Sequence, residues 1–356
     1  MIKPHALRPG DKVAIVSLSN GILGEPFCSH YLELGTRRLQ EFGLEPVFMP
    51  NALKGMEYLK QHPEARAADL KAAFMDESIR GIIAAIGGDD TYHLLPYLMA
   101  DPEFVRQVQT HPKLFTGFSD STINHLMFHR LGMVSFYGPN YINDLSEMAD
   151  GMLSYTKQAF NGYLSGEFPL CSSPVWYEER TDFSPQQLGI DRVCHPEHHG
   201  FEVIQGSGIF RGQLLGGCLE SFYDILTQNR YPDQKQICET YRLFPSKEEW
   251  GGKALFLETC EERPTPELLA KELTVLKEQG VFDVISGILV GKPQNEIWYK
   301  EYKEIYRQVI DRPDLPILYN LNFGHAYPRM VLPYGIEIEV NMDTKQLQFC
   351  EPIFEY

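Results

Sequence analysis

The chain has 356 residues, of which 43% are hydrophobic and 22% are charged. A chain of this length and composition predicts a globular protein of two domains with a sizeable apolar core. Acidic residues outnumber basic residues by 48 to 32, which disfavours a nucleic-acid polymer or an anionic membrane as a partner. A small anionic ligand held by a few local donors remains compatible with this charge.

Seven cysteines are scattered along the chain without C-x-x-C pairs. Their odd number argues against a disulfide framework and predicts reduced thiols. The first residues, MIKPHALRPGDKVAIVSL, are partly polar and include Pro-Gly, so they do not resemble a signal peptide. No apolar run approaches the roughly 18 residues of a membrane span. We therefore expect a cytoplasmic protein without a membrane partner.

Strands and helices are predicted to alternate through the first part of the chain. The predicted strands are 12–18, 46–48, 80–86, 113–118 and 134–137, and the predicted helices are 27–42 and 63–75. The run at 80–86 (RGIIAAI) is almost continuously apolar, as is typical of a strand buried on both faces. This order predicts an α/β domain over residues 1–166, built on an open and mostly parallel sheet.

The composition changes between residues 167 and 207. Proline, aromatic and charged residues mix there without a sustained period (PLCSSPVWYEERTDFSPQQ), which predicts a linker and a long functional or mobile loop. Strands and helices then return and predict a second, smaller α/β domain over residues 208–356. Its predicted strands are 208–215, 253–258, 284–290, 317–320, 336–340 and 346–350, and its predicted helices are 265–279 and 298–310.

The stretch Lys113 to Thr122 (KLFTGFSDST) is the first candidate for a functional site. Its apolar start predicts a short buried strand, and the SDST that follows consists of residue types that cap helices. A strand, a sharp turn and a helix can present a serine as a nucleophile, and the N–H of the next residue can then bind an oxyanion. Ser119 is therefore a candidate nucleophile. The alternative is that it only caps the helix.

Two more polar residues stand at the ends of predicted strands, where the active sites of α/β proteins form. Glu258 ends the strand KALFLET, and His325 follows the strand ILYN within the segment NFGH. A serine nucleophile needs an imidazole to take its proton and a carboxylate to orient that imidazole. Ser119, Glu258 and His325 together therefore predict a catalytic triad. Taken alone, Glu258 would be interpreted as an ion-paired surface residue, and His325 could equally be a capped loop histidine.

The segment Gly87 to Thr91 (GGDDT) has two interpretations besides a tight turn. Its glycines let the backbone approach a ligand closely, and the residues after them can start a helix whose N–H groups face an anion. GGDDT also resembles the signature of phosphofructokinases and of NAD or lipid kinases. Those families usually carry a glycine-rich phosphate loop near the first strand, whereas this chain has SNGILGEP there. A phosphotransferase is the alternative from another functional class.

Histidines cluster at two places, and neither pattern predicts a metal site. His125 and His129 lie one helical turn apart, but Leu126 stands where zinc peptidases place a glutamate. The segment 194–199 (CHPEHH) is denser, yet it lacks a second distant pair of ligands. We expect no metal and no other cofactor.

Six motifs together resemble the LD-carboxypeptidase family of serine peptidases, and they occur in the family's order almost to the C-terminus. They are GGDD (87–90), GFSDST (117–122), FYGPN (136–140), GGCLES (216–221), LFLETCEE (255–262) and NFGHAYPRMVLPYG (322–335). The forms IGGDD and LFLET, and the long segment before Gly208, are most similar to the microcin C immunity peptidase branch. The carboxypeptidases are shorter in that segment and usually read GG-Tyr-Gly.

The resemblance implies a flavodoxin-like N-terminal domain with the nucleophile and a swivelling β/α C-terminal domain with the other two catalytic residues, in a homodimer. Ser119 is then the nucleophile, His325 the base and Glu258 its orienting partner. The N–H groups of Gly88 and Asp120 would form the oxyanion hole. A neutral His325 with a pKa of about 6 to 7 would suit this role.

The resemblance also implies a substrate. The immunity branch cleaves the amide that joins a C-terminal aspartyl residue to a modified adenylate, and a loop tryptophan stacks on the base. The expected substrate is therefore a peptidyl- or aspartyl-nucleotide such as processed microcin C. Trp176 in SPVWYEE is the candidate here, and Asp89, Asn140 and Cys218 are the other candidate substrate-binding residues. Cys218 stands where related proteins often have a ligand-contacting asparagine. An LD-carboxypeptidase that trims murein tetrapeptides is the alternative with the same chemistry.

Overall fold

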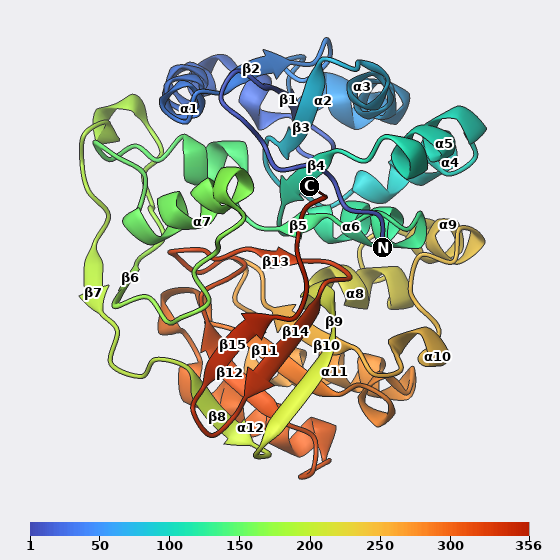
Figure 1. Cartoon of the computed structure of the whole chain (residues 1–356), viewed down its shortest axis with the longest axis vertical. Coiled ribbons are helices and arrows are strands. Elements are labelled where there is room, and N and C mark those ends of the chain that lie inside the picture. Colours follow the sequence, from blue (N-terminus) through green and yellow to red (C-terminus); the bar gives the residue numbers. More distant parts are fainter. Residues whose placement is uncertain (356) are drawn as a thin grey trace.

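Two sheets organise the computed structural model, which describes residues 1–355. Figure 1 shows the domain built on the first sheet at the top, in blue to green, and the domain built on the second sheet below it, in yellow to red. The segment 167–207 runs down one side of the molecule between them. The predicted two-domain α/β fold is confirmed.

The N-terminal sheet is parallel except at one edge. Its strands are β1 (Lys12–Val16), β2 (Glu45–Phe48), β3 (Ile79–Ala84), β4 (Leu114–Gly117), β5 (Phe136–Tyr137) and β13 (Leu332–Pro333). Their order is β13-β5-β4-β3-β1-β2, and β13 alone runs antiparallel to its neighbour. The order 2-1-3-4-5 is flavodoxin-like. Ligands in such sheets bind outside the carboxyl ends of the strands, near the switch between β1 and β3.

Helices cover both faces of this sheet because the side chains of its strands alternate in direction. The helices are α1 (Ser29–Glu41), α2 (Met56–Gln61), α3 (Pro63–Met75), α4 (Leu95–Leu98), α5 (Pro102–Thr110), α6 (Ser121–Arg130) and α7 (Ser154–Ser165). Val13 and Ile15 of β1 share a hydrophobic cluster with α1 and α7. Ala14 and Val16 share the other cluster with α3 and α6. The helix predicted at 63–75 is observed with those bounds as α3.

The C-terminal sheet is mixed. Its strands are β8 (Glu202–Gln205), β9 (Ile209–Cys218), β10 (Ala254–Glu258), β11 (Gly287–Gly291), β12 (Ile317–Leu321), β14 (Glu337–Asn341) and β15 (Gln346–Phe349). They lie in the order β15-β14-β9-β10-β11-β12-β8. The four strands from β9 to β12 are parallel, and the remaining strands add antiparallel edges.

The helices of the C-terminal domain include three that the sequence did not predict. They are α8 (Leu219–Thr227), α9 (Gln234–Thr240), α10 (Lys247–Trp250), α11 (Pro266–Glu278) and α12 (Tyr299–Ile310), and the first three are the additions. The predicted helix α11 starts where the hydroxyl of Thr265 accepts the N–H of Leu268 and Pro266 takes the first helical position.

The predicted linker contains regular structure. Within it, β6 (Val175–Tyr177) and β7 (Cys194–Pro196) form an antiparallel ribbon, and β8 already belongs to the C-terminal sheet. Near the end of the chain, β13 returns to the N-terminal sheet, and Ile353 and Phe354 join its hydrophobic cluster. The two domains are therefore interleaved, and the limits at residues 166 and 208 stay a prediction.

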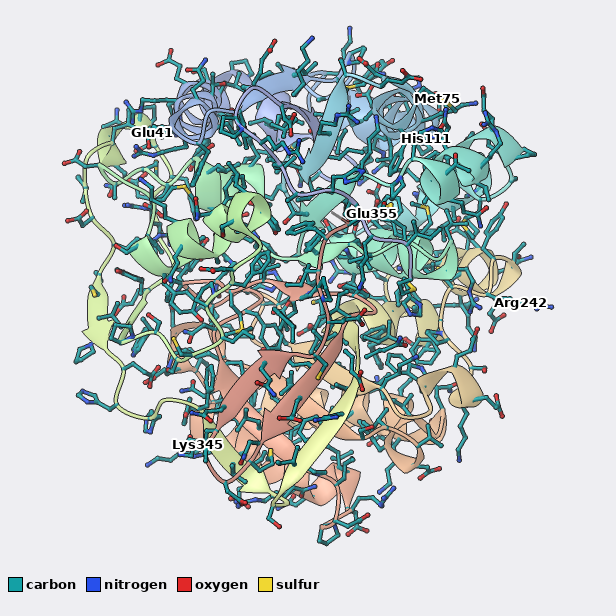
Figure 2. All side chains as sticks on the ribbon, viewed as in Figure 1. Glu41, Met75, His111, Arg242, Lys345 and Glu355 are labelled. Carbon is teal, nitrogen blue, oxygen red and sulfur yellow. The ribbon has the colours of Figure 1, made fainter. Side chains whose placement is uncertain are left out.

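Side chains fill the space between the sheets and their helices (Figure 2). Charged residues such as Glu41, Arg242 and Lys345 are exposed at the periphery in the same view. No helix within residues 1–355 combines the length and the apolar character needed to cross a bilayer.

Candidate active site

Ser119 lies in the tight turn that joins β4 to α6. Its φ angle is +65°, in the left-handed region that a serine adopts only where the surrounding structure imposes it. The carbonyl oxygen of Ser119 accepts the N–H of Thr122 at 2.9 Å, so the backbone of the serine, not its hydroxyl, caps the first turn of α6. A strained serine between a strand and a helix has the backbone geometry of a nucleophile.

The loop Gly87–Asp90 after β3 packs directly against this serine. A Cβ atom at Gly87 would lie 2.8 Å from the hydroxyl oxygen of Ser119, so only glycine fits there without movement. The buried carboxylate of Asp90 fixes the loop from the other side, because it pairs with the buried Arg66 at 2.5 Å. Gly87 thus allows the close approach to Ser119, Gly88 allows one to Ser19, and the acidic residue Asp90 anchors the loop.

His325 and Glu258 form a buried pair at the carboxyl end of β10. The Nδ1 atom of His325 lies 2.8 Å from Oε2 of Glu258, and the backbone N–H of His325 donates to the same oxygen at 3.1 Å. Gly324 allows this approach: its φ angle is +78°, and a Cβ atom there would overlap the carboxyl group of Glu258. The carboxylate therefore orients the ring through Nδ1 and leaves Nε2 for the reaction.

Tyr137 connects the serine to this pair. Its hydroxyl accepts the N–H of Ser119 at 3.1 Å and donates to Oε1 of Glu258. Burial and the charge of Glu258 raise the pKa of Tyr137 well above its usual value, so the hydroxyl stays protonated. One carboxylate thus holds the histidine directly and the backbone of the serine through the tyrosine.

A second carboxylate occupies the other nitrogen of His325. Oε2 of Glu261 lies 2.9 Å from Nε2, so within residues 1–355 this nitrogen is paired with Glu261 rather than with Ser119. Burial alone would lower the pKa of His325, but the charges and hydrogen bonds of Glu258 and Glu261 outweigh it and raise the pKa to about 10. The imidazole is therefore a cation in this state, which differs from the neutral base expected from the sequence.

Arg329 fixes the loop that bears His325. Its buried guanidinium pairs with Asp144 at 2.7 Å and donates to the carbonyl oxygens of Gly324 and of His325, the latter at 3.3 Å. The guanidinium carbon also lies 4.2 Å from the ring centroid of Phe118, the residue before the serine. Arg329 is therefore a positioning residue that acts on both halves of the site.

Ser119, His325 and Glu261 line one cavity of about 560 Å³. The cavity lies outside the carboxyl ends of β1, β3 and β4, where the flavodoxin-like strand order places a ligand. One wall comes from the predicted linker, which contributes Arg180 and Phe183. The predicted linker therefore reaches the same space as Ser119 and His325 of the predicted triad, whereas Glu258 is buried behind His325.

The four residues predicted to contact the substrate are not among the described residues that line this cavity. Trp176 lies on β6 and stacks on His195, with ring centroids 4.2 Å apart. Asp89 forms an ion pair with Arg230 at 3.3 Å. Each of these two side chains already has a partner within the chain.

The other two are buried. Asn140 accepts the N–H of Asn143 at 2.8 Å and thereby caps the turn before α7. The thiol of Cys218 donates to Glu220 at 3.1 Å and lies within 4.8 Å of the potential ligand atoms of Glu258 and His325. Burial raises the pKa of Cys218 well above its usual value, so it is an uncharged thiol behind the triad.

Two of the histidines that the sequence singled out, His125 and His195, have local partners. The ring nitrogens of His125 lie 2.8 Å from the Ser135 hydroxyl and 2.9 Å from the Gly117 carbonyl oxygen. His195 contacts the carboxylate of Glu178 at 2.7 Å as well as Trp176. His125 thus stabilises the end of β4 from below the serine.

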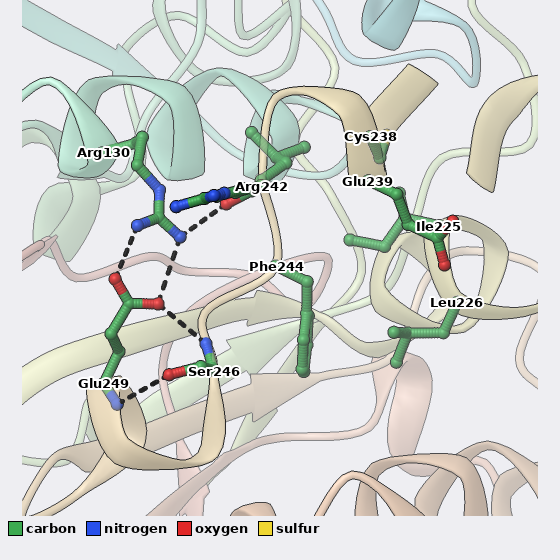
Figure 3. Close-up of a pocket in the computed structure, with 10 residues that line it drawn as sticks. Arg130, Ile225, Leu226, Cys238, Glu239, Arg242, Phe244, Ser246 and Glu249 are labelled. Carbon is green, nitrogen blue, oxygen red and sulfur yellow. Dashed lines mark hydrogen bonds and ion pairs between the residues drawn. The ribbon is translucent and has the colours of Figure 1, made fainter. Parts of the chain in front are cut away.

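A second cavity, of about 580 Å³, lies between α6 and the helices α8 to α10 (Figure 3). Arg130 of the N-terminal domain pairs there with Glu249 of α10 at 2.5 Å and donates to the carbonyl oxygen of Arg242. Ser246 caps α10 by accepting the N–H of Glu249. These contacts join the two domains away from the triad.

Tyr137 and Arg329 are candidate functional residues to which the sequence assigned no role, and Glu261, like Glu262, was considered only as a substitute for Glu258. Tyr137 and Arg329 lie within the motifs FYGPN and NFGHAYPR, so the motifs were the available signal. Glu261 is one of two adjacent acidic residues in a turn, and such a pair usually indicates side chains exposed to solvent. Local sequence patterns do not predict which residues, distant in the sequence, these side chains contact.

Comparisons with known proteins agree with this architecture. Residues 13–138 match the LD-carboxypeptidase N-terminal domain, and residues 211–340 match the LD-carboxypeptidase C-terminal domain. The microcin C7 self-immunity protein MccF of Escherichia coli is 24% identical over 296 residues, which are 80% of this chain and 78% of that protein. A probable murein peptide carboxypeptidase of Bacillus subtilis is 26% identical over 350 residues, which are 96% and 92% of the two chains.

Solved structures include similar proteins as well. The MccF-like protein from Streptococcus pneumoniae, in complex with AMP, is 48% identical with a TM-score of 0.92, and the match covers 95% of this chain and 98% of that one. MccF in complex with aspartyl sulfamoyl adenosine has the same fold, with a TM-score of 0.80 and 21% identity over 100% of both chains. This chain therefore belongs to the LD-carboxypeptidase family of serine peptidases, family S66.

Proposed function

We propose that this chain is a serine peptidase that hydrolyses the amide joining an aspartyl residue to an adenylate. The main supporting observation is the shared cavity, in which Ser119 and His325 face Arg180 and Phe183 of the long loop. The Streptococcus pneumoniae protein, 48% identical and solved with AMP, supports a nucleotide as one part of the substrate.

The reaction uses the three residues of the proposed triad in turn. The hydroxyl oxygen of Ser119 attacks the scissile carbonyl while Nε2 of His325 takes the hydroxyl proton, and Glu258 stabilises the imidazolium through Nδ1. The imidazolium then gives its proton to the leaving nitrogen, which releases the nucleotide part and leaves an acyl ester on the serine. A water deprotonated by the same nitrogen hydrolyses the ester and restores the enzyme.

The developing oxyanion needs N–H donors that are not already hydrogen-bonded to another acceptor. We assign this role to the N–H groups of Gly88 and Asp120, which within residues 1–355 donate to no protein acceptor. The carboxylate of Asp120 accepts the N–H of Thr91 at 2.9 Å, so this side chain is used behind the turn. Its N–H follows the nucleophile directly, as in other strand-turn-helix nucleophile sites.

The cavity has a cationic part for the anionic linkage of a nucleotide and an aromatic part for its base. Arg263 lines the cavity and is a cation for an anionic linkage, whereas Arg180, which also lines it, is already paired with Glu147 at 2.6 Å. Phe27 and Phe183 are 59% and 47% exposed, which is unusual for phenylalanine, and both line the cavity. The hydroxyl of Tyr31 donates to the carbonyl oxygen of Phe183 at 3.4 Å and so connects the loop to α1. Exposed aromatic rings suit a purine better than a murein peptide.

Two alternatives are separated from this proposal by one set of incubations. An aspartyl-sulfamoyl-adenosine and a murein tetrapeptide are offered to the same preparation, with and without Mg-ATP. We expect the nucleotide to be cleaved in both conditions, with the serine covalently labelled by a serine-directed reagent. Cleavage of the tetrapeptide alone would favour murein trimming, which the Bacillus subtilis relative represents. A requirement for Mg-ATP would favour the phosphotransferase, against which the Arg66 pairing of Asp90 already argues.

A matched pair of variants tests which aromatic ring stacks on the base. Stacking of one base is worth about 1–3 kcal/mol, so loss of that ring should raise KM for the adenylate roughly tenfold to a hundredfold, with a smaller effect on kcat. Trp176 is the ring proposed from the sequence, and Phe183 is the ring that lines the cavity. We expect Phe183→Ala to give the larger rise. Equal losses with the tetrapeptide, together with a lower melting temperature, would mean that the ring only stabilises the fold.

The pH dependence of kcat/KM tests the electrostatics of the base. The imidazole must be neutral to take a proton, so the pKa of about 10 places the acid limb of the wild-type profile at high pH. Glu261→Gln removes one of the two anions and should move that limb to lower pH by about 1 to 3 pH units. Glu262→Gln, one residue along the turn, is the control and should leave the limb in place. An unchanged limb in Glu261→Gln would contradict the pairing.

A further inference from the structure

Glu261 competes with the nucleophile for the catalytic nitrogen. Its carboxylate is 2.9 Å from Nε2 of His325, which is the atom that must take the proton of Ser119. A histidine with carboxylates on both nitrogens donates from both and has no lone pair for a third partner. Turnover therefore requires that Glu261 leave His325 whenever a substrate is bound.

The position of Glu261 allows this movement. Its side chain is 62% exposed, whereas the side chains of His325 and Glu258 are 7% and 1% exposed. Glu261 lies in the turn after β10, and it lines the cavity rather than the core. The buried pair is the fixed part of the site, and the carboxylate on Nε2 is the movable part.

An incoming cation is the chemical group that would take Glu261 away. The hydrogen bond to His325 lowers the pKa of Glu261 to about 2, so this side chain is an anion at any physiological pH. The charged groups around the two partners are Glu258 on Nδ1, Arg230 near Glu261, and Arg329 on the backbone carbonyl of His325. Moving Glu261 into solvent without a new partner would forfeit a charge-assisted hydrogen bond.

The chemistry of the reaction places such a cation at this point. In an aminoacyl group the α-nitrogen is bonded to the carbon next to the scissile carbonyl, roughly 2.5 Å from the carbonyl carbon. The scissile carbonyl carbon must approach the Ser119 oxygen to about 3–3.5 Å, with the hydroxyl proton directed at Nε2 of His325. An α-ammonium is therefore delivered within a few ångströms of Nε2, which is where the Glu261 carboxylate lies.

We propose that Glu261 binds the free α-ammonium of an aminoacyl-nucleotide substrate, and that the ammonium replaces His325 as its partner. The proton on Nε2 then leaves to water, so that one positive charge enters the site as another departs. Substrates with a free α-amine thus convert the imidazolium into a base on binding. N-acylated, peptidyl forms lack the cation and do not. This inference rests on the proposed function and restricts its substrate to aminoacyl-nucleotides with an unblocked amine.

Kinetics with two substrates test the specificity. Aspartyl-sulfamoyl-adenosine and its Nα-acetyl derivative are compared in the wild type, in Glu261→Gln and in Glu262→Gln. We expect the wild type and Glu262→Gln to prefer the free amine in kcat/KM by roughly tenfold to a hundredfold, the range for a charged hydrogen bond. In Glu261→Gln the preference should collapse, because cleavage of the acetyl compound rises at pH 7 while cleavage of the free amine falls.

Calorimetry provides a second measurement that does not depend on turnover. In a Ser119→Ala background, binding of aspartyl-sulfamoyl-adenosine at pH 7 should release about one proton, measured from the heats in buffers of different ionisation enthalpy. The acetyl derivative should release none, and neither ligand should release a proton when Glu261→Gln is added. Proton release that persists without Glu261, or a free-amine preference unchanged in Glu261→Gln, would overturn the inference and leave the proposed function intact. If the wild type cleaves neither nucleotide, the proposed function fails and this inference fails with it.

Discussion

Replacement of Ser119 by alanine is expected to preserve the fold and to lower turnover by about four or more orders of magnitude, as for other triad nucleophiles. The hydroxyl makes the bond to the substrate, whereas the capping of α6 is done by the carbonyl oxygen of Ser119, which alanine keeps. The measurement is kcat on aspartyl-sulfamoyl-adenosine together with the circular dichroism spectrum. Activity within tenfold of the wild type would exclude Ser119 as the nucleophile.

Ser119→Gly is the matched control for this variant. The φ angle of +65° is unfavourable for alanine and serine but not for glycine. Both variants should be inactive, while glycine should unfold at a higher temperature than alanine, by an amount that corresponds to about 1 kcal/mol. Equal stabilities would show that the turn is not strained at this residue.

Glu258→Gln is expected to retain substrate binding and to lower kcat by about 10⁴, which corresponds to about 5 kcal/mol of transition-state stabilisation. Glutamate accepts from the histidine through Oε2 and from Tyr137 through Oε1, and it is buried. An amide has only one oxygen, so it fails to accept on one of these two sides. It also lacks the charge that stabilises the imidazolium of His325.

Tyr137→Phe separates the two functions of this carboxylate. The variant removes the link to the backbone of Ser119 but keeps the ion pair of Glu258 with His325. We expect a smaller loss of kcat than in Glu258→Gln, with KM little changed. Normal turnover in Glu258→Gln would mean that another carboxylate serves the base, and Glu261 or Glu262 would be the next candidate.

Sequence reasoning identified the fold and the residues of the proposed triad because both depend on local patterns. Apolar runs of strand length predict the strands that precede Ser119, Glu258 and His325, and the carboxyl ends of parallel strands meet at one edge of a sheet. The structure places Ser119 and His325 on one cavity and Glu258 against His325, and their catalytic roles stay a prediction. Their order along the chain supplied the link to the family.

The parts that sequence reasoning missed depend on contacts between distant segments. The helices between residues 219 and 250 are short, and their ends are set by packing against other elements rather than by a long apolar period. Glu261 pairs with His325, which lies 64 positions further along the chain, and the turn that contains Glu261 has a sequence typical of a solvent-exposed turn. The place of Trp176 on a small ribbon depends on the partner strand at 194–196, which composition alone did not reveal.

The return of β13 to the N-terminal sheet has a consequence for the order in which the protein folds during synthesis. Until residues 332–333 leave the ribosome, β5 is an unpaired edge of that sheet, and the hydrophobic cluster beside it lacks Ile353 and Phe354. An open sheet edge is a site for mispairing between chains, so we expect the N-terminal half to be prone to mispairing until β13 has been made. Truncated products that contain Ser119 but end before β13 are therefore expected to aggregate more readily than the chain that includes β13.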